Sequence, residues 1–187
     1  MKRSEINTLV HEAKAAFETA GWILPPFPRW DVTDFGLGHW PRHGLVLINL
    51  ADEMEYCEKL MYAREGMETP AHAHAKKKED IIARHGVLRI SLWKNRLLSA
   101  EGTVKIKLNG EFHELPSGSI VDLPGGHRIT LVPGTYHAFV PVSGPCIIGE
   151  VSTANDDLND NFFANPAVGR FTQIEEDEPP IVRLVSD

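Results

Sequence analysis

The first apolar residues of the chain repeat at steps of three and four positions. They are Ile6, Leu9, Val10, Ala13, Phe17 and Ala20. This spacing places them on one face of a helix, which we expect to cover residues 4–20. Gly21 and the Pro25-Pro26 pair follow, and they end the helical pattern. The apolar face is thus available to pack against another part of the protein.

The pattern changes after residue 43 to short apolar runs separated by turn residues. We expect strands in residues 44–50, 59–63, 79–83, 87–94, 103–108, 119–123, 128–132, 137–142 and 146–152. Asn109-Gly110, between two of these runs, is a strong signal for a two-residue hairpin. Many short strands beside one helix predict an all-β fold, either an antiparallel sandwich or a barrel.

Two segments lie outside this pattern. Residues 25–44 are rich in Pro and Gly and predict an irregular arm, although Trp30 and Trp40 in it suggest that the arm packs on the body of the protein. The C-terminal part begins with polar residues and ends in the apolar run 181–185, which predicts a last strand. We therefore expect a single domain over residues 1–187, with helix and arm in 1–40 and the barrel and C-terminal segment in 41–187.

Composition narrows the class of function. Hydrophobic residues make up 42% of the chain and charged residues 24%, as in a soluble globular protein. No apolar run approaches the roughly 18 residues of a membrane span, and the N-terminus lacks the apolar core of a signal peptide. The net charge of −7 argues against a nucleic-acid partner. Cys57 and Cys146 are too few for a disulfide framework, so we expect packed thiols in a cytoplasmic protein.

Candidate chemistry gathers between Gly66 and Gly86. His72 and His74 alternate with alanines and are followed by Glu79. Imidazole and carboxylate are ligands for Zn, Mn, Fe, Co or Ni, and three of them leave coordination positions open. In a strand, His72 and His74 point to the same side, whereas Glu79 has the opposite parity, so the chain must turn or bulge between residues 75 and 78. A strand that starts near Lys77 would then direct Lys77 and Glu79 inward, and Lys76 and Lys78 outward.

A fourth candidate ligand lies further along the chain. The spacing of Gly66, His72, His74, Glu79 and Gly86 is that of the first cupin motif. The second motif is represented by Gly126, Pro133, Gly134 and His137, although Pro133 and Gly134 are adjacent without the usual residue between them. The fold class is therefore expected to be a cupin-type antiparallel β-barrel (jelly roll), with His72, His74, Glu79 and His137 around a metal ion.

The chain resembles the D-lyxose isomerases, a cupin family. The resemblance lies in LPPF, WDVTDFG, EKLMYAREGMETPAHAHAKKKEDI, PGTYHAF, GEVSTANDD and IEEDEP, which together span nearly the whole length. It implies the four metal ligands above, a catalytic lysine at Lys77 and a catalytic glutamate at Glu175 or Glu176. Ala73 and Ala75 stand where the family usually has bulky residues, which predicts a wider pocket.

The resemblance also implies the activity. We expect a metal-dependent isomerase that interconverts an aldose and a ketose, with D-lyxose and D-xylulose as the first pair, through a cis-enediol intermediate. Manganese is the first candidate metal, with zinc, iron or cobalt as alternatives, and a homodimer is the expected assembly. We expect the metal to lower the pKa of Lys77. Two alternatives remain open: an iron-dependent cupin dioxygenase and a sugar-binding cupin without catalysis.

Overall fold

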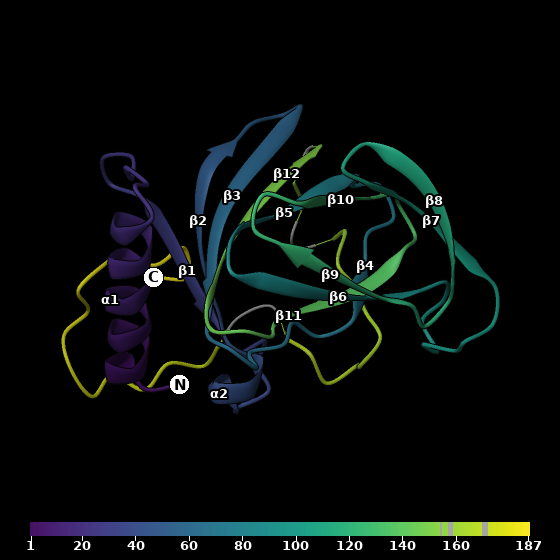
Figure 1. The fold of residues 1–187 in the computed structure, drawn as a ribbon. Coiled ribbons are helices and arrows are strands. Elements are labelled where there is room, and N and C mark those ends of the chain that lie inside the picture. Colours follow the sequence, from purple (N-terminus) through teal and green to yellow (C-terminus); the bar gives the residue numbers. More distant parts are fainter. Residues whose placement is uncertain (154, 157–158, 170–171) are drawn as a thin grey trace.

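The predicted helix is present. The computed structural model describes residues 1–153, 155–156, 159–169 and 172–187, and its first helix, α1, covers Arg3–Thr19. The predicted apolar face of α1 is buried, and Phe17 stacks on Trp30 with ring centroids 6.5 Å apart. Helix α1 lies beside the strands β1 (Arg29–Thr33) and β2 (Leu45–Asp52), with the rest of the barrel on their other side (Figure 1). The helix is thus joined to the barrel through one continuous hydrophobic core.

Thirteen strands and one further short helix are found in the described residues. Their bounds are β1 Arg29–Thr33, α2 Trp40–His43, β2 Leu45–Asp52, β3 Tyr56–Ala63, β4 His72–Ala73, β5 Glu79–His85, β6 Val87–Trp93, β7 Thr103–Leu108, β8 Glu111–Pro116, β9 Ile120–Pro124, β10 Arg128–Leu131, β11 Tyr136–Pro141, β12 Cys146–Thr153 and β13 Phe162–Phe163.

The strands form two antiparallel sheets. The larger has the order β1-β2-β3-β12-β5-β10-β7-β8, and the smaller has the order β13-β4-β11-β6-β9. This arrangement confirms the predicted all-β class, with the N-terminal helix at one side of the barrel (Figure 1). The hairpin between β7 and β8 turns at Asn109 and Gly110, both with positive φ, as a tight two-residue turn requires.

Two predictions about the ends of the chain were wrong. The segment predicted as an irregular arm contains β1, which pairs with β2 along its whole length, and α2. The apolar run 181–185 does not form a strand and makes only an isolated bridge between Trp30 and Leu184. Both errors have the same cause, because the pairing of short segments depends on partners far away in the sequence. Among the described residues, no helix has both the length and the apolar character needed to cross a membrane.

Candidate metal centre and active-site cavity

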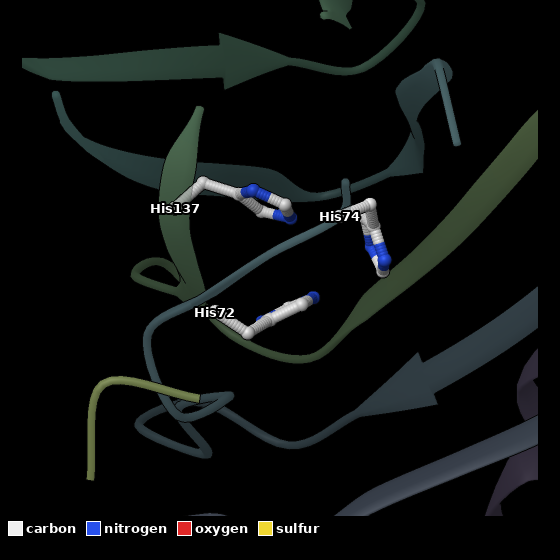
Figure 2. A group of neighbouring side chains, drawn as sticks. All are labelled: His72, His74 and His137. Atoms are coloured by element: carbon white, nitrogen blue, oxygen red, sulfur yellow. The ribbon is translucent and has the colours of Figure 1, made fainter. Parts of the chain in front are cut away.

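The three predicted histidine ligands meet between the two sheets. His72 lies on β4 and is paired with His137 on β11, while His74 follows β4 by one residue. One ring nitrogen from each lies within 4.8 Å of those of the others. The three rings point toward one common space (Figure 2). The alternation of strand residues explains why His72 and His74 share this side.

Backbone contacts fix which nitrogen of each ring faces the common space. Nδ1 of His72 lies 2.9 Å from the carbonyl oxygen of Pro70. Nδ1 of His74 lies 2.7 Å from that of Asp160, and Nδ1 of His137 lies 3.1 Å from that of Thr135. A carbonyl can only accept a hydrogen bond, so each Nδ1 carries a hydrogen, which leaves Nε2 as the nitrogen that can bind a metal ion. Burial, together with the two neighbouring imidazoles, holds the pKa of His72 well below its usual value, which keeps this ring neutral.

Glu79 lies beside two of the three histidines. Its Oε1 lies 3.0 Å from Nε2 of His137, and its Oε2 lies 3.5 Å from Nε2 of His74. Glu79 Oε1 and both of these Nε2 atoms are buried without a hydrogen-bond partner. Buried acceptors that face one another are unfavourable unless a cation lies between them. The donor set of three imidazoles and one carboxylate therefore fits a divalent metal ion.

Lys77 lies beside this group, with the orientation that parity predicts. Lys77 and Glu79 are buried, whereas Lys76 and Lys78 are exposed. The Lys77 ammonium lies 3.1 Å from Glu79 Oε2 and 3.0 Å from Glu150 Oε1. Burial lowers the pKa of Lys77, but the carboxylates of Glu150 and Glu79 outweigh it, so without a metal ion the pKa is raised. Lys77 is thus a cation held between two carboxylates.

The sequence analysis did not single out Glu150. It lies on β12, is 7% exposed and points into the same cavity as Lys77. Lys59 on β3 lies 3.5 Å from it on the other side. Burial raises the pKa of Glu150, but Lys59 and Lys77 more than offset this, so the carboxyl group is ionised at neutral pH. A signal was present in the sequence, since Glu150 is the one charged residue in the run CIIGEVS.

The cavity has a polar and an aromatic side. His72, His74, Lys77, Glu150 and Lys59 line it together with Asp31 and Thr33 from β1, and Phe35 and Phe163 form part of its wall. The rings of Phe35 and Phe163 pack edge to face at 6.4 Å, and Phe163 also packs on His72 at 5.5 Å. Polar groups beside aromatic rings suit a ligand with both hydroxyl groups and apolar C–H faces, such as a sugar.

The structure does not support a pocket widened by small residues between the histidines. Ala73 has the opposite parity to His72 and His74, and Ala75 is exposed. Neither residue lines the cavity.

The predicted catalytic glutamates lie elsewhere in the chain's fold. Glu175 forms a parallel bridge with Lys2, and the backbone N–H of Arg3 donates to its carbonyl at 2.8 Å. The Glu176 carboxylate accepts a hydrogen bond of 2.8 Å from Nε of Arg3 at the start of α1. Both side chains are exposed, and neither lines the cavity. The structure thus brings together Lys77 and the four candidate ligands, but not Glu175 or Glu176.

Comparisons with known proteins show which family the chain belongs to. The model of the D-lyxose isomerase family matches residues 1–30 and 28–187. A D-lyxose/D-mannose isomerase of Serratia proteamaculans is 35% identical over 96% of this chain and 94% of its own length. A second protein with this name, from Escherichia coli O157:H7, is 34% identical over 100% of this chain and 98% of its own.

A solved structure shares the fold. The L-ribose isomerase of Cellulomonas parahominis superposes with a TM-score of 0.71 at 19% identity and covers 94% of this chain and 98% of its own. At that identity the likeness concerns the fold alone. The family is shown by the sequence matches, and the chain belongs to the D-lyxose isomerase family.

Proposed function

We propose that this protein is a metal-dependent aldose-ketose isomerase that acts on a free sugar, with D-lyxose and D-xylulose as the first pair. The observation that carries the proposal is the position of Lys77 and Glu150, a buried acid/base pair in the cavity of the histidine cluster. The names of the relatives add D-mannose as the second substrate to test.

Isomerisation requires a proton to move between C1 and C2. The Glu150 carboxylate takes the proton from C2 of the aldose as the electron pair forms a C1–C2 double bond. The Lys77 ammonium hydrogen-bonds the carbonyl oxygen O1 as negative charge develops there. The Glu150 carboxyl group then returns the proton to C1, while the Lys77 ammonium gives a proton to O1 and the resulting amine takes the proton that leaves O2, which yields a ketose and restores both side chains. Reactant and product have the same atoms and the same overall oxidation state.

His72, His74, Glu79 and His137 are the residues proposed to hold the metal. A divalent ion there would supply a Lewis acid that polarises the substrate carbonyl and its neighbouring hydroxyl group. Mn²⁺ is the first candidate to test. Zinc, iron and cobalt are the alternatives, since a set of imidazoles and one carboxylate can bind any of these ions. The ε-nitrogens of the rings are oriented for this role by the carbonyl contacts of their Nδ1 atoms.

Two other functions make different predictions. An iron-dependent dioxygenase would consume oxygen, and a sugar-binding protein without catalysis would bind a sugar and leave it unchanged. Glu175 and Glu176 lie outside the cavity. Without another carboxylate to act as the base, this placement would favour the sugar-binding protein without catalysis. Glu150 provides that carboxylate beside Lys77, so the isomerase is favoured.

Metal analysis followed by a sugar assay tests the proposal. The purified protein is depleted with a chelator, reloaded with Mn²⁺, Co²⁺, Zn²⁺ or Fe²⁺, and assayed for ketose formation from a panel of pentoses and hexoses. We expect conversion of D-lyxose that is lost on depletion and restored by Mn²⁺. Sugar binding without conversion, or oxygen uptake, would contradict the proposal. In deuterated water, proton transfer places deuterium on the carbon that receives hydrogen, whereas a hydride shift leaves that carbon unlabelled.

Assembly and compartment complete the proposal. A homodimer of the 20.8 kDa chain is expected to sediment at twice that mass, about 42 kDa. The chain has only two cysteines, Cys57 and Cys146, which are too few for a disulfide framework and so support a reducing compartment, the cytoplasm.

A further inference from the structure

Asp160 is a buried acidic residue to which the proposed chemistry assigns no part. It is 5% exposed and lies in the segment between β12 and β13. Its carboxylate accepts hydrogen bonds from three consecutive backbone N–H groups, those of Ala75 at 2.8 Å, Lys76 at 3.1 Å and Lys77 at 2.8 Å. Burial raises the pKa of Asp160, but these N–H groups more than offset it and keep the carboxyl group ionised.

These contacts lie where the chain must change its parity. His72 and His74 face the site at one parity, and Lys77 and Glu79 face it at the other, so residues 75–78 must form an irregular turn. A turn of this kind leaves backbone N–H groups without sheet partners, and each needs an acceptor. Asp160 accepts from the first three, and the hydroxyl group of Thr153 accepts from Lys78 at 3.1 Å.

The same residue also orients a candidate ligand. The Asp160 backbone carbonyl accepts the Nδ1–H of His74 at 2.7 Å, which directs Nε2 of that ring toward His137 and Glu79. Two residues further on, β13 pairs with β4 and brings Phe163 opposite His72. One short segment therefore contacts both the ligand strand and the turn that follows it.

We propose that Asp160 is a positioning residue that sets the geometry of the metal site and of Lys77 at once. Its carbonyl fixes the ring of His74, and its carboxylate fixes the backbone from which Lys77 reaches Glu79 and Glu150. Outer contacts of this kind change metal affinity by about 10- to 100-fold when they are lost. The inference rests on the proposed function, since it concerns the same site.

The test compares Asp160→Asn with Asp156→Asn. Asparagine keeps the shape of Asp160 but removes its charge and turns an N–H group toward the backbone donors. Asp156 is the matched control, because it lies in the same segment and accepts from the N–H of Asn159, with no contact to residues 75–77 among the described ones. The readouts are the Mn²⁺ dissociation constant of the chelator-treated protein, kcat and KM at saturating Mn²⁺, and the melting temperature without metal.

We expect Asp160→Asn to weaken Mn²⁺ binding by about tenfold or more. It should also lower kcat at saturating Mn²⁺ more than it raises KM, because Lys77 is displaced. Asp156→Asn should match the wild-type protein. If both variants bind Mn²⁺ and turn over within twofold of each other, the inference is overturned while the proposed function stands. A wild-type protein that binds no metal and converts no sugar overturns both.

A measurement on the unchanged protein covers the case in which Asp160→Asn fails to fold. Amide hydrogen exchange of Ala75, Lys76 and Lys77 in the metal-free wild-type protein should be strongly slowed, since all three N–H groups are bonded to one buried carboxylate. Exchange at the rate of an unstructured peptide would overturn the inference without any variant.

Discussion

At the scale of single residues, the direction of a side chain decides its role. Lys76, Lys77 and Lys78 are identical in chemistry, yet only Lys77 is buried against two carboxylates. Glu150, Glu175 and Glu176 differ in the same way, since only Glu150 lines the cavity. The alternation of strand residues made the choice among the lysines predictable. The choice among the glutamates was not predictable, because it depends on how distant segments pack.

Glu150→Gln tests the new assignment of the acid/base residue. The amide cannot accept the proton from C2, so kcat should fall by about 10²- to 10⁴-fold. Metal content should persist, because Glu150 is not among the candidate ligands. Glu175→Gln is the matched control, an exposed glutamate at the N-terminal side of the protein, and it should keep wild-type kcat. Loss of activity in Glu175→Gln but not in Glu150→Gln would assign the acid/base role to the C-terminal segment instead.

Lys77→Met tests the second member of the pair. Methionine keeps much of the length of the side chain but removes its charge, so we expect retained metal and a kcat about 10²- to 10³-fold lower. Lys78→Met, one residue further and exposed, should behave as the wild-type protein. Metal analysis and steady-state kinetics measure both effects. Equal turnover in the two variants would remove Lys77 from the mechanism.

At the scale of elements, the turns determine how neighbouring strands meet. Some of these turns need glycine both for its positive φ and because a Cβ has no room. Gly86 joins β5 to β6 with φ of +83°, and Gly110 joins β7 to β8 with φ of +95°. A Cβ at Gly86 would lie 2.7 Å from both Cys146 Sγ and the Pro145 carbonyl oxygen. At Gly110 it would meet only Arg128 Nη2, at 3.7 Å. Gly86 is therefore constrained by both conformation and space.

The two glycines should respond differently to alanine. Gly110→Ala carries only the strain of a left-handed backbone and should lower the free energy of unfolding by about 1–2 kcal/mol. Gly86→Ala adds overpacking against β12 and should cost about 1–3 kcal/mol more. Denaturant unfolding of the metal-free proteins measures both values. Similar losses in the two variants would show that the contact with Cys146 and Pro145 relaxes freely.

The C-terminal tail is held on α1 by charges, so its attachment depends on pH. The Arg3 guanidinium holds the pKa of the Glu176 carboxyl group below its usual value. A lowered folded-state pKa gives stability that is complete above the unfolded value of about 4.3 and is lost as the pH falls through the folded value. The melting temperature of Arg3→Gln should thus lie below that of the wild-type protein at pH 7, and the difference should shrink below about pH 4.

A control separates this ion pair from a general charge effect. Arg29 and Asp52 are 3.9 Å apart, at the limit of an ion pair, so Arg29→Gln should change the melting temperature little at either pH. Arg3 also pairs with Asp187, with Nη2 and Oδ1 3.0 Å apart. A difference between the wild-type protein and Arg3→Gln that stays constant from pH 7 to pH 3 would mean that Arg3 acts through packing and not through the Glu176 and Asp187 carboxylates.

At the scale of the whole molecule, the proposed metal ligands come from both sheets. Glu79 belongs to the larger sheet, and His72 and His137 belong to the smaller one. An ion bound by all of them would therefore stabilise the folded protein as a unit. Free Mn²⁺ at 100 times its dissociation constant adds about 2.7 kcal/mol. For a chain of this size, that corresponds to a rise in melting temperature of roughly 5–11 °C.

Differential scanning calorimetry with and without Mn²⁺ measures this shift. His137→Gln should lose most of the shift, whereas His113→Gln, an exposed histidine on β8, should retain it. An equal shift in both variants would place the bound ion somewhere other than this cluster.

The sequence by itself determined the features that depend on local alternation and turn chemistry. The helix, the Asn109-Gly110 hairpin, the all-β class and the inward direction of Lys77 follow from periods of 3.6 and 2 and from residues that permit positive φ. Only the tertiary structure decided which distant groups meet. Glu150 reaches Lys59 and Lys77 because β12 lies between β3 and β5, and Asp160 reaches residues 75–77 across more than 80 positions of the chain. Such contacts are set by the packing and register of whole strands, which leave no periodic signal at the residues themselves.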